Sequence, residues 1–414
     1  MRVIEPHQLR RTPRRSVKQR FKRLVVPVLL VAILLSALAL GSWRYHQPLP
    51  AFTFTETEQH YSQKEHSFTW PEQGQSAVGA VGFGVLGVSS QDTKPMPTAS
   101  LAKIITALVI LDKKPLQLDE QGETITLTIE DEEIYHRYLA EDGSVSAVTA
   151  GEALTQYQAL QALLLPSSNN MAETLTNWAF GSQTDYIRYA NDYVKKLGLT
   201  QTTVADSSGF SAQTVSTPHD LVFIGIAALQ NPVIAQIVQQ EQADVPLAGT
   251  IYNTNRLLGQ SGINGIKTGN TNEAGGCYLV SAVQHYDNGQ SVTTVAAIMG
   301  TPTLTDAMNQ SKPLLAQTRD GFGDTVVATA GQQFGSVKTA WGSQAAVVVK
   351  KDVSLFGWKD GAPMVSSKLE SKAFAKGARL GEAEITFGTA KASVELVQND
   401  GLAPPTAQWR LFRR

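Results

Sequence analysis

The sequence is almost without cysteine. Cys277 is the one cysteine in 414 residues, so neither an intrachain disulfide nor a site made of several cysteine ligands can form. The seven histidines contain no pair at the i, i+4 spacing and no other spacing typical of metal ligands. We therefore expect no metal and no organic cofactor.

Acidic residues are scarce at the N-terminus. Residues 1–23 hold nine Lys or Arg and one acid, Glu5, and so carry +8, which leaves −9 for the other 391 residues because the whole chain carries −1. A basic tail of this kind can bind nucleic acid. A hydrophobic segment follows it directly, however, so we expect a membrane and no nucleic acid as its partner.

Residues 24–41, "LVVPVLLVAILLSALALG", contain no charged residue and no polar face. As a helix they would span roughly 27 Å, enough to cross a bilayer core. The basic residues before this segment, with Trp43 and Tyr45 after it, favour a transmembrane anchor. Ala37-Leu38-Ala39 also resembles a signal-peptide cleavage site, so a secreted chain cleaved after Ala39 is the alternative. In both cases residues 42–414 are expected outside the cytoplasm.

The remaining chain divides by pattern into a polar tether (residues 42–72), an α+β domain (73–318) and a β-rich domain (325–414). In the α+β domain we predict strands at 76–88, 275–285 and 291–300, the last two joined by a hairpin at Asp287-Asn288-Gly289. Predicted helices cover 100–113 with one buried face, run from a capping box at Thr149 to Leu165, begin near Asn170 and cover 184–198. Within the last domain only residues 366–377 have a helix-like pattern.

Ser100 and Lys103 lie one turn apart at the start of the first predicted helix. A serine hydroxyl becomes a good nucleophile when a nearby base removes its proton. A buried lysine can be that base, because burial lowers its pKa. The helix start adds free N–H groups that favour developing negative charge.

Two other polar clusters lie at positions where they could join this pair. Ser167-Ser168-Asn169 separates two predicted helices, and Lys267-Thr268-Gly269 opens an apolar strand. The first offers a hydroxyl and an amide to a substrate. The second offers a cation, a hydroxyl for a carboxylate, and a glycine that lets a substrate backbone approach.

Together, Ser-x-x-Lys, Ser-x-Asn and Lys-Thr-Gly resemble the motifs of the penicillin-recognising serine enzymes. The segments "PTASLAKIITAL", "LLLPSSNN", "DSSGF", "STPHDL", "NTNRLL" and "NGIKTGNTNEAG" resemble those of the D-alanyl-D-alanine carboxypeptidases, the low-molecular-mass penicillin-binding proteins. The resemblance covers about residues 75–318, and "LGEAEITFG" and "PPTAQWRL" resemble that family's C-terminal domain. It implies a β-lactamase/DD-peptidase-like α+β domain followed by a small all-β domain.

The resemblance also implies the catalytic roles. Ser100 would be the acylated nucleophile and Lys103 its base, while Ser167 and Asn169 would transfer protons and position the substrate. The backbone N–H groups of Ser100 and Asn270 would form the oxyanion hole.

The implied substrate is the peptidoglycan stem peptide, bound by Lys267, Thr268 and Gly269. Its terminal D-alanine would be removed through an acyl-enzyme, and β-lactam antibiotics would be covalent inhibitors.

Three features depart from that family. Asn170 stands where an Asp is usual after Ser-x-Asn. The stretch after "AAIMG" lacks the arginine that helps to bind the substrate carboxylate. The printed chain ends in "WRLFRR", without the amphipathic C-terminal helix that some relatives place on the membrane, so we expect residues 24–41 to supply the attachment.

Three other functions remain open. A β-lactamase of the most similar class needs Glu-x-x-Leu-Asn, whereas Glu173 in "ETLTN" is one residue out of register and is expected on a helix surface. A DD-transpeptidase differs only in using an amine in place of water as the acyl acceptor. A wall-binding scaffold protein would have kept the fold without the activity, although the motif residues are all present.

Overall fold

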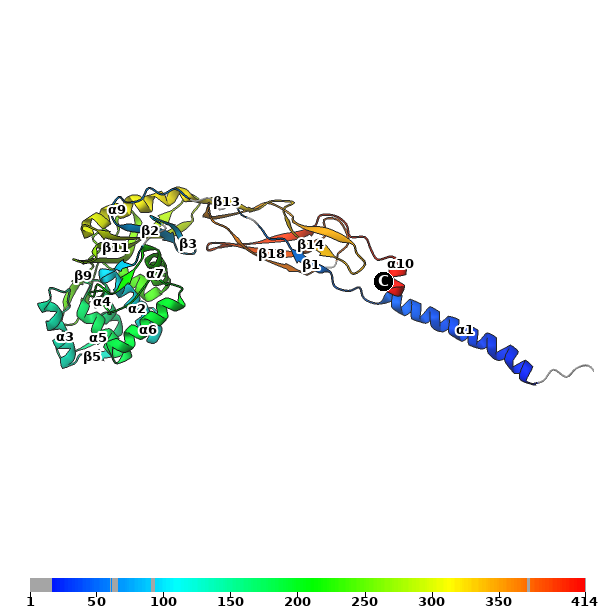
Figure 1. Cartoon of the computed structure of the whole chain (residues 1–414), viewed down its shortest axis with the longest axis horizontal. Helices are drawn as coiled ribbons and strands as arrows, with labels where there is room; N and C mark the ends of the chain where they lie inside the picture. The colour runs from blue at the N-terminus through cyan, green and yellow to red at the C-terminus, as the bar shows by residue number, and fades with distance from the viewer. Residues whose placement is uncertain (1–16, 60, 62–65, 91–93, 371–372, 414) are drawn as a thin grey trace, which may run out of the picture.

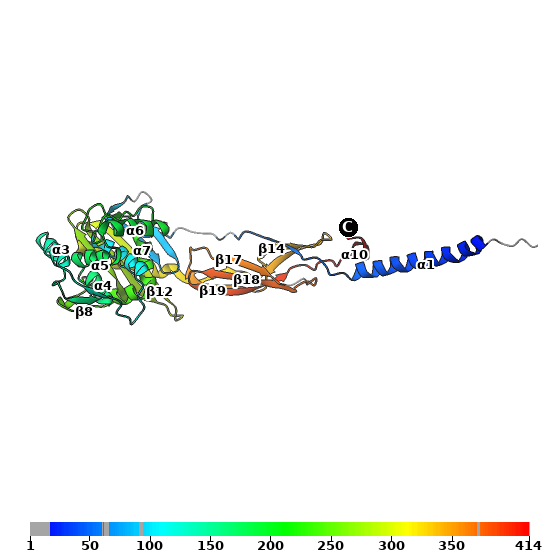
Figure 2. The same ribbon diagram turned by 90° about the horizontal axis from the view of Figure 1, so that it is seen from below.

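The computed structural model of the chain describes residues 17–59, 61, 66–90, 94–370 and 373–413, with the side chains of helix α1 described from Val25 onward. The predicted basic tail therefore lies outside the described residues, except for the backbone from Val17. The molecule is elongated: a mixed helix and sheet part, a β-rich part and a single long helix follow one another along its axis (Figures 1 and 2).

A five-stranded antiparallel sheet forms the centre of the mixed part. Its strands, in spatial order, are β10 (Ile263–Thr271), β11 (Gly275–His285), β12 (Ser291–Thr301), β2 (Gln75–Ala80) and β3 (Gly84–Val88). The predicted strands and the hairpin between β11 and β12 are confirmed. Gly289, with φ 80°, provides the left-handed residue of that turn.

Helices cover both faces of this sheet. Along β12, Val295, Ala297 and Met299 belong to one hydrophobic cluster, while the intervening residues Ala296 and Ile298 belong to another. This alternation is the period of two of a strand buried on both sides. The first cluster also contains residues of α7 (Pro218–Gln230), and the second contains residues of α9 (Leu304–Gln317).

Helix α2 (Ala102–Lys113) follows the short 3₁₀ helix η1 (Ala99–Leu101). The other helices of this part are α3 (Ile129–Ala140), α4 (Gln156–Leu164), α5 (Asn169–Phe180), α6 (Gln183–Lys196) and α8 (Pro232–Val238). Helices α4, α5, α6 and α7 pack against α2. Every residue from Ala102 to Leu111 is buried. The prediction of a single buried face was therefore wrong, because neighbours surround this helix.

The predicted capping box at Thr149 was also wrong. Residues 153–155 form strand β6 (Ala153–Thr155), which pairs with β5 (Thr124–Thr126). The helix begins only after this pairing, and its capping box is formed by Thr155 and Gln158. Two Thr-x-x-Glu/Gln patterns lie six residues apart in the sequence, and strand pairing selects the second.

Short strand pairs complete the mixed part. They are β4 (Met96–Pro97) with β7 (Val215–Ser216), and β8 (Gln242–Val245) with β9 (Gly249–Tyr252); a second 3₁₀ helix, η2 (Gln260–Gly262), precedes β10. A third, η3 (Arg319–Gly321), leads into the β-rich part.

A six-stranded antiparallel sheet dominates the β-rich part. Its order is β1 (Thr53–Glu56), β14 (Gln333–Lys338), β15 (Gln344–Val349), β19 (Ala390–Gln398), β18 (Arg379–Phe387) and β17 (Met364–Leu369), and β13 (Phe322–Ala328) pairs separately with β16 (Val353–Trp358). The tether prediction missed β1, whose partner β14 is remote in sequence. The helix-like pattern at 366–377 was misleading, because residues 364–369 alternate in exposure as the edge strand β17.

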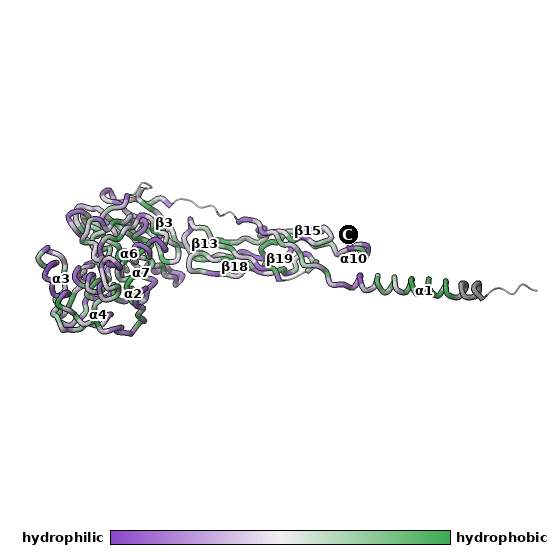
Figure 3. Tube along the Cα trace, turned by 60° about the horizontal axis from the view of Figure 1, so that its bottom comes forward, coloured by the Kyte–Doolittle hydropathy of each residue, from purple (hydrophilic) through white to green (hydrophobic). Residues whose placement is uncertain are grey.

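Two helices lie at the far end of the molecule. Helix α1 (Val17–His46) contains a stretch, Val25–His46, that is long and apolar enough to cross a membrane, and its residues are mostly hydrophobic (Figure 3). The short helix α10 (Ala407–Phe412) follows the β-rich part and packs against the end of α1 (Figure 1). The length and hydropathy of the stretch Val25–His46 fit a membrane anchor or a signal sequence.

Candidate active site

Ser100 lies in a tight turn at the head of α2. The turn is the 3₁₀ helix η1, and Ala99, directly before Ser100, has a left-handed backbone (φ 46°). A residue with a side chain adopts this conformation only at a cost of about 1–3 kcal/mol, which surrounding structure must overcome. The half-buried Ser100 is therefore held at a strained bend that leads into a helix buried from Ala102 to Leu111.

Lys103 is fully buried one turn later. Its Nζ lies 2.9 Å from Ser100 Oγ, 2.7 Å from Asn169 Oδ1 and 2.9 Å from the carbonyl oxygen of Ser208. Burial lowers the pKa of Lys103 well below its usual value, the positive charge of Lys267 lowers it further, and Asp206 acts in the opposite direction.

The three neighbours of Lys103 each accept a hydrogen bond from its Nζ. Asn169 Oδ1 and the Ser208 carbonyl can only accept, so they hold two N–H donors of Lys103 in either protonation state. The third donor points at Ser100 Oγ, so loss of that proton from Nζ would leave a lone pair facing the Ser100 hydroxyl. This arrangement suits a base that removes the serine proton.

The Ser-x-Asn motif meets Lys103 from the start of α5. Asn169 is the first residue of that helix, and Ser167 has a left-handed backbone (φ 68°) although it is not glycine. Both side chains are almost fully buried. Among the described residues, no hydrogen bond is made by the Ser167 hydroxyl. Ser144 fixes this turn from outside, because its carbonyl oxygen accepts from Asn169 N at 2.7 Å.

The Lys-Thr-Gly motif lies on β10. Lys267 is 1% exposed, its Nζ donates to the carbonyl oxygen of Thr268 at 3.0 Å, and burial lowers its pKa to about 7. A Cβ on Gly269 would lie 3.0 Å from Ser100 N, so glycine lets β10 approach the turn that holds Ser100 this closely. Asn270 follows at the exposed end of the buried run. Its role in an oxyanion hole stays a prediction.

The predicted residues Ser100, Lys103 and Asn169 are thus joined by hydrogen bonds, and Gly269 brings β10 against them. Two further segments complete the site, and the sequence had given neither of them a role.

The first is the turn at residues 206–210. The carboxylate of Asp206 accepts from the backbone N–H groups of Ser208 and Phe210, which presents the Ser208 carbonyl to Lys103. The hydroxyl of Thr106, on α2, donates to the Ser207 carbonyl at 2.6 Å. A Cβ on Gly209 would lie 1.9 Å from the Ala99 carbonyl oxygen, so this glycine lets the turn press on the strained residue.

The second is the segment before η2. Thr254 Oγ1 lies 2.7 Å from Thr268 Oγ1, and Thr254 N donates to the carbonyl oxygen of Leu165. Asn255 next to it donates to the Gly265 carbonyl and accepts from the Tyr278 hydroxyl. The pair of threonine hydroxyls orients the motif residue Thr268. Only the segment "NTNRLL" signalled this part of the site in the sequence.

Comparisons with known proteins now bear on this geometry. A model of the D-alanyl-D-alanine carboxypeptidase family matches residues 84–303, which is more than half of the chain. The chain belongs to this family.

Curated relatives match part of this region. The chain is 31% identical over 195 residues to a D-alanyl-D-alanine endopeptidase of Escherichia coli, covering 45% of this chain and 59% of that protein. It is 34% identical over 195 residues to the D-alanyl-D-alanine carboxypeptidase DacB2 of Mycobacterium tuberculosis, covering 45% and 62%. The match thus spans less than two thirds of either relative.

Solved structures share the fold. Penicillin binding protein 5 from Haemophilus influenzae aligns with a TM-score of 0.57 at 19% identity, covering 82% of this chain and all of that chain. The Streptomyces K15 DD-transpeptidase aligns with a TM-score of 0.53 at 23% identity, covering 60% and 98%. The predicted α+β fold with a β-rich C-terminal part is therefore confirmed.

Asn170, which departs from the family pattern, and Glu173, weighed above for a β-lactamase, both have structural partners. Asn170 accepts from Ser146 N through its Oδ1 and donates to the Ser146 carbonyl through its Nδ2, so its amide pins the loop before β6. Glu173 is not the free surface residue that we expected: Arg137 and the Tyr138 hydroxyl both donate to it. A carboxylate engaged in this way is poorly placed to activate a water.

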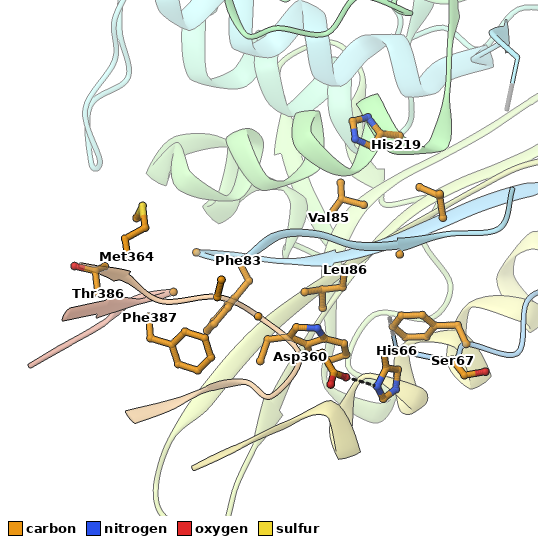
Figure 4. Close-up of a pocket in the computed structure, with 18 of the residues that line it drawn as sticks. His66, Ser67, Phe83, Val85, Leu86, His219, Asp360, Met364, Thr386 and Phe387 are labelled. Atoms are coloured by element: carbon orange, nitrogen blue, oxygen red, sulfur yellow. Dashed lines mark hydrogen bonds and ion pairs between the residues drawn. The ribbon is translucent and has the colours of Figure 1, made fainter. Parts of the chain in front are cut away.

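A large groove in this structure lies away from the predicted site residues. A groove of about 960 Å³ lies where the β2–β3 hairpin meets the β-rich part, between residues such as Phe83, His219 and Asp360 (Figure 4). His66 and Asp360 face each other there at 3.2 Å. None of the predicted site residues lines this groove, whereas a cavity of about 500 Å³ adjoins Asn270.

Proposed function

We propose that the protein is a membrane-tethered serine D-alanyl-D-alanine carboxypeptidase that removes the terminal D-alanine of peptidoglycan stem peptides. The observation that carries the proposal is the position of the buried Lys103, whose Nζ lies 2.9 Å from Ser100 Oγ. Burial also lowers the pKa of Lys103. A buried amine without a carboxylate partner is costly to a fold. Its presence beside a serine at a strained turn is typical of a catalytic site.

In the acylation step, Ser100 Oγ attacks the carbonyl carbon between the last two D-alanines, and its proton moves to Lys103 Nζ. The tetrahedral intermediate then collapses, the C–N bond breaks, and the departing D-alanine amine takes up a proton. The hydroxyl of Ser167 would carry that proton, while the Asn169 amide holds both Lys103 and the substrate. Water attacks the resulting ester and frees Ser100.

Negative charge on the carbonyl oxygen would be stabilised by the N–H groups of Ser100 and Asn270. The close approach of Gly269 to Ser100 N supports this assignment, because it brings the two segments that carry these donors together. Losing one such donor typically costs about a hundredfold or more in rate.

The carboxylate of the substrate would be bound by Thr268 and by the positive charge of Lys267. The family's arginine after β12 is absent from this chain, so we assign a further share to the Thr254 hydroxyl that touches Thr268. The same groups would receive the carboxylate of a penicillin, which acylates Ser100 as a covalent inhibitor.

The membrane is assigned as a partner through α1. Its apolar side chains are exposed, for example Leu34 at 61%, as in a helix surrounded by lipid. We infer a single-pass anchor that holds the catalytic part outside the cell; cleavage after Ala39 would release it instead.

Product analysis tests this function. The full chain in detergent is incubated with a stem pentapeptide and with a cross-linked peptide dimer, and the products are separated by chromatography and weighed. We expect the tetrapeptide and free D-alanine, with both absent for Ser100→Ala. A protein that only joins peptides or only splits the dimer would contradict the carboxypeptidase assignment, and an inactive wild-type protein would favour the scaffold alternative.

A further inference from the structure

Helix α10 and the outer end of α1 form a joint surface that the proposed catalysis does not use. A Cβ on Gly41 of α1 would lie 3.7 Å from Leu411 Cδ2 of α10. Gly41 lies within the apolar span Val25–His46. Helix α10 therefore lies level with the last turns of the candidate membrane helix, not above them.

Reciprocal hydrogen bonds hold the two helices together. Arg410 Nη1 donates to the carbonyl oxygen of Tyr45 at 3.2 Å, and its guanidinium lies 5.2 Å from the centre of the Tyr45 ring. In the other direction, Arg44 Nη1 donates to the carbonyl oxygen of Leu411 at 3.4 Å.

Arg413 closes the end of α1. It donates to the carbonyl oxygens of Gln47 at 3.1 Å and of Arg44 and Pro48 at 3.4 Å. The last carbonyls of a helix have no partner within the helix, and that end carries partial negative charge. The carbonyl of Arg44 belongs to the last turn of α1 and those of Gln47 and Pro48 follow it, so a guanidinium from 365 or more residues away in sequence lies at the negative end of this helix.

Positive charge at this surface has no acidic counterpart nearby in the sequence. Residues 41–55 and 401–414 contain no Asp or Glu. Each guanidinium offers five N–H donors, more than the carbonyls use. Beside the arginines, the aromatic side chains of Trp43 and Phe412 are 63% and 61% exposed. Exposed aromatic rings next to cations at the end of an apolar helix are typical of a membrane interface.

We propose that Arg44, Arg410 and Arg413 form a collar around the outer end of α1 that binds the phosphate groups of anionic phospholipids, with Trp43 and Phe412 in the interface. The proposal rests on the membrane insertion of α1 in the proposed function. Guanidinium groups bind phosphate strongly because their paired donors match two phosphate oxygens. Trp409 of α10 also packs against Trp341 at 5.2 Å, so the collar would seat the β-rich part on the membrane.

Lipid retention tests the collar. The full chain is reconstituted in vesicles of phosphatidylcholine mixed with phosphatidylglycerol, extracted in mild detergent, and examined by native mass spectrometry for the lipids that stay bound. We expect the wild type to retain phosphatidylglycerol preferentially. Arg410→Gln with Arg413→Gln should lower that preference roughly fivefold for each charge removed. The matched control, Arg188→Gln with Arg379→Gln, removes two exposed arginines elsewhere and should change nothing.

A third variant separates the effect of the positive charge from that of the paired guanidinium donors. Arg410→Lys with Arg413→Lys keeps the charge but loses the paired donors, so its preference should lie between those of the wild type and the glutamine variant. If the glutamine variant does not fold by circular dichroism, the wild type supplies the test, because its preference should fall as salt is raised. A preference for phosphatidylglycerol that changes neither with the substitutions nor with salt would contradict the proposed collar.

Flotation with the same vesicles keeps this result apart from the proposed function. A wild-type chain that does not float would contradict both the anchor and the collar. One that floats without preferring phosphatidylglycerol would contradict the collar alone. Neither readout depends on the chemistry of Ser100.

Discussion

The two folded parts of the molecule bury very different side chains. The mixed part encloses two lysines, Lys103 and Lys267, at 0% and 1% exposure. The described β-rich part buries a core of aliphatic and aromatic residues such as Phe334 and Phe387, and its few buried polar residues, Thr339 among them, carry no charge. Burying a charge-bearing group without an acid partner costs stability. The difference therefore separates the part that holds the candidate site from a part whose described core buries no charged group.

Removing the buried base should have the largest effect. We expect Lys103→Met to lower the rate of acylation by a penicillin by roughly a hundred- to ten-thousandfold, because the hydroxyl of Ser100 loses its proton acceptor. A fluorescent penicillin and gel densitometry measure this rate. Lys113→Met, the same change at the exposed end of α2, is the matched control and should leave the rate unchanged.

The β-rich part should show the opposite response. Phe334 is fully buried in the β-rich core, so Phe334→Ala should lower the free energy of unfolding of that part by about 3–5 kcal/mol. Differential scanning calorimetry measures the loss, and the acylation rate at low temperature should hold. Val326→Ala, at a residue 55% exposed, should cost little. A large drop in the acylation rate of the Phe334 variant would show that the reaction at Ser100 depends on the stability of the β-rich part.

The second buried lysine should make substrate binding depend on pH. Burial lowers the pKa of Lys267 to about 7, so below that value it is charged and above it neutral. We expect the KM for a substrate with a free carboxylate to rise above pH 7, by up to about tenfold per pH unit. A substrate amide should show no such rise, and equal profiles for the two would contradict this role.

The same shift affects stability with a defined sign. The folded protein binds fewer protons than the unfolded chain between pH 7 and the usual lysine pKa of 10.5. Lys267 therefore costs the most stability below pH 7, and that cost declines as pH rises toward 10.5.

The smallest effect is expected at Thr254. Thr254→Val removes the hydroxyl that touches Thr268 without changing the side-chain shape, and should raise the KM for a carboxylate substrate about two- to tenfold with kcat nearly constant. Thr254→Ser keeps the hydroxyl and should behave like the wild type. A fall in kcat with unchanged KM would exclude a role in carboxylate binding.

The sequence predicted the parts of this comparison that depend on local pattern. The Ser100 and Lys103 pair, the strands around Gly289 and the start of α5 follow from spacing within a few residues. Structural roles that depend on remote partners were not predicted: the turn at 206–210 was noted only as a family-like segment, yet Gly209 meets Ala99, and β1 is a strand because β14 pairs with it.

The errors have the same origin. Thr149 has the sequence of a helix cap, but residues 153–155 form strand β6, which pairs with β5. Glu173 was expected on a surface, yet α3 supplies Arg137 and Tyr138 to it. In each case tertiary pairing overrode a local preference.

The most direct test of the account is the mass of the full chain after incubation with a penicillin, followed by peptide mapping. We predict one added penicillin on the peptide that contains Ser100, and none on the Ser100→Ala protein. An unmodified wild-type chain, or an adduct that persists in Ser100→Ala, would contradict the claim that Ser100 is the nucleophile.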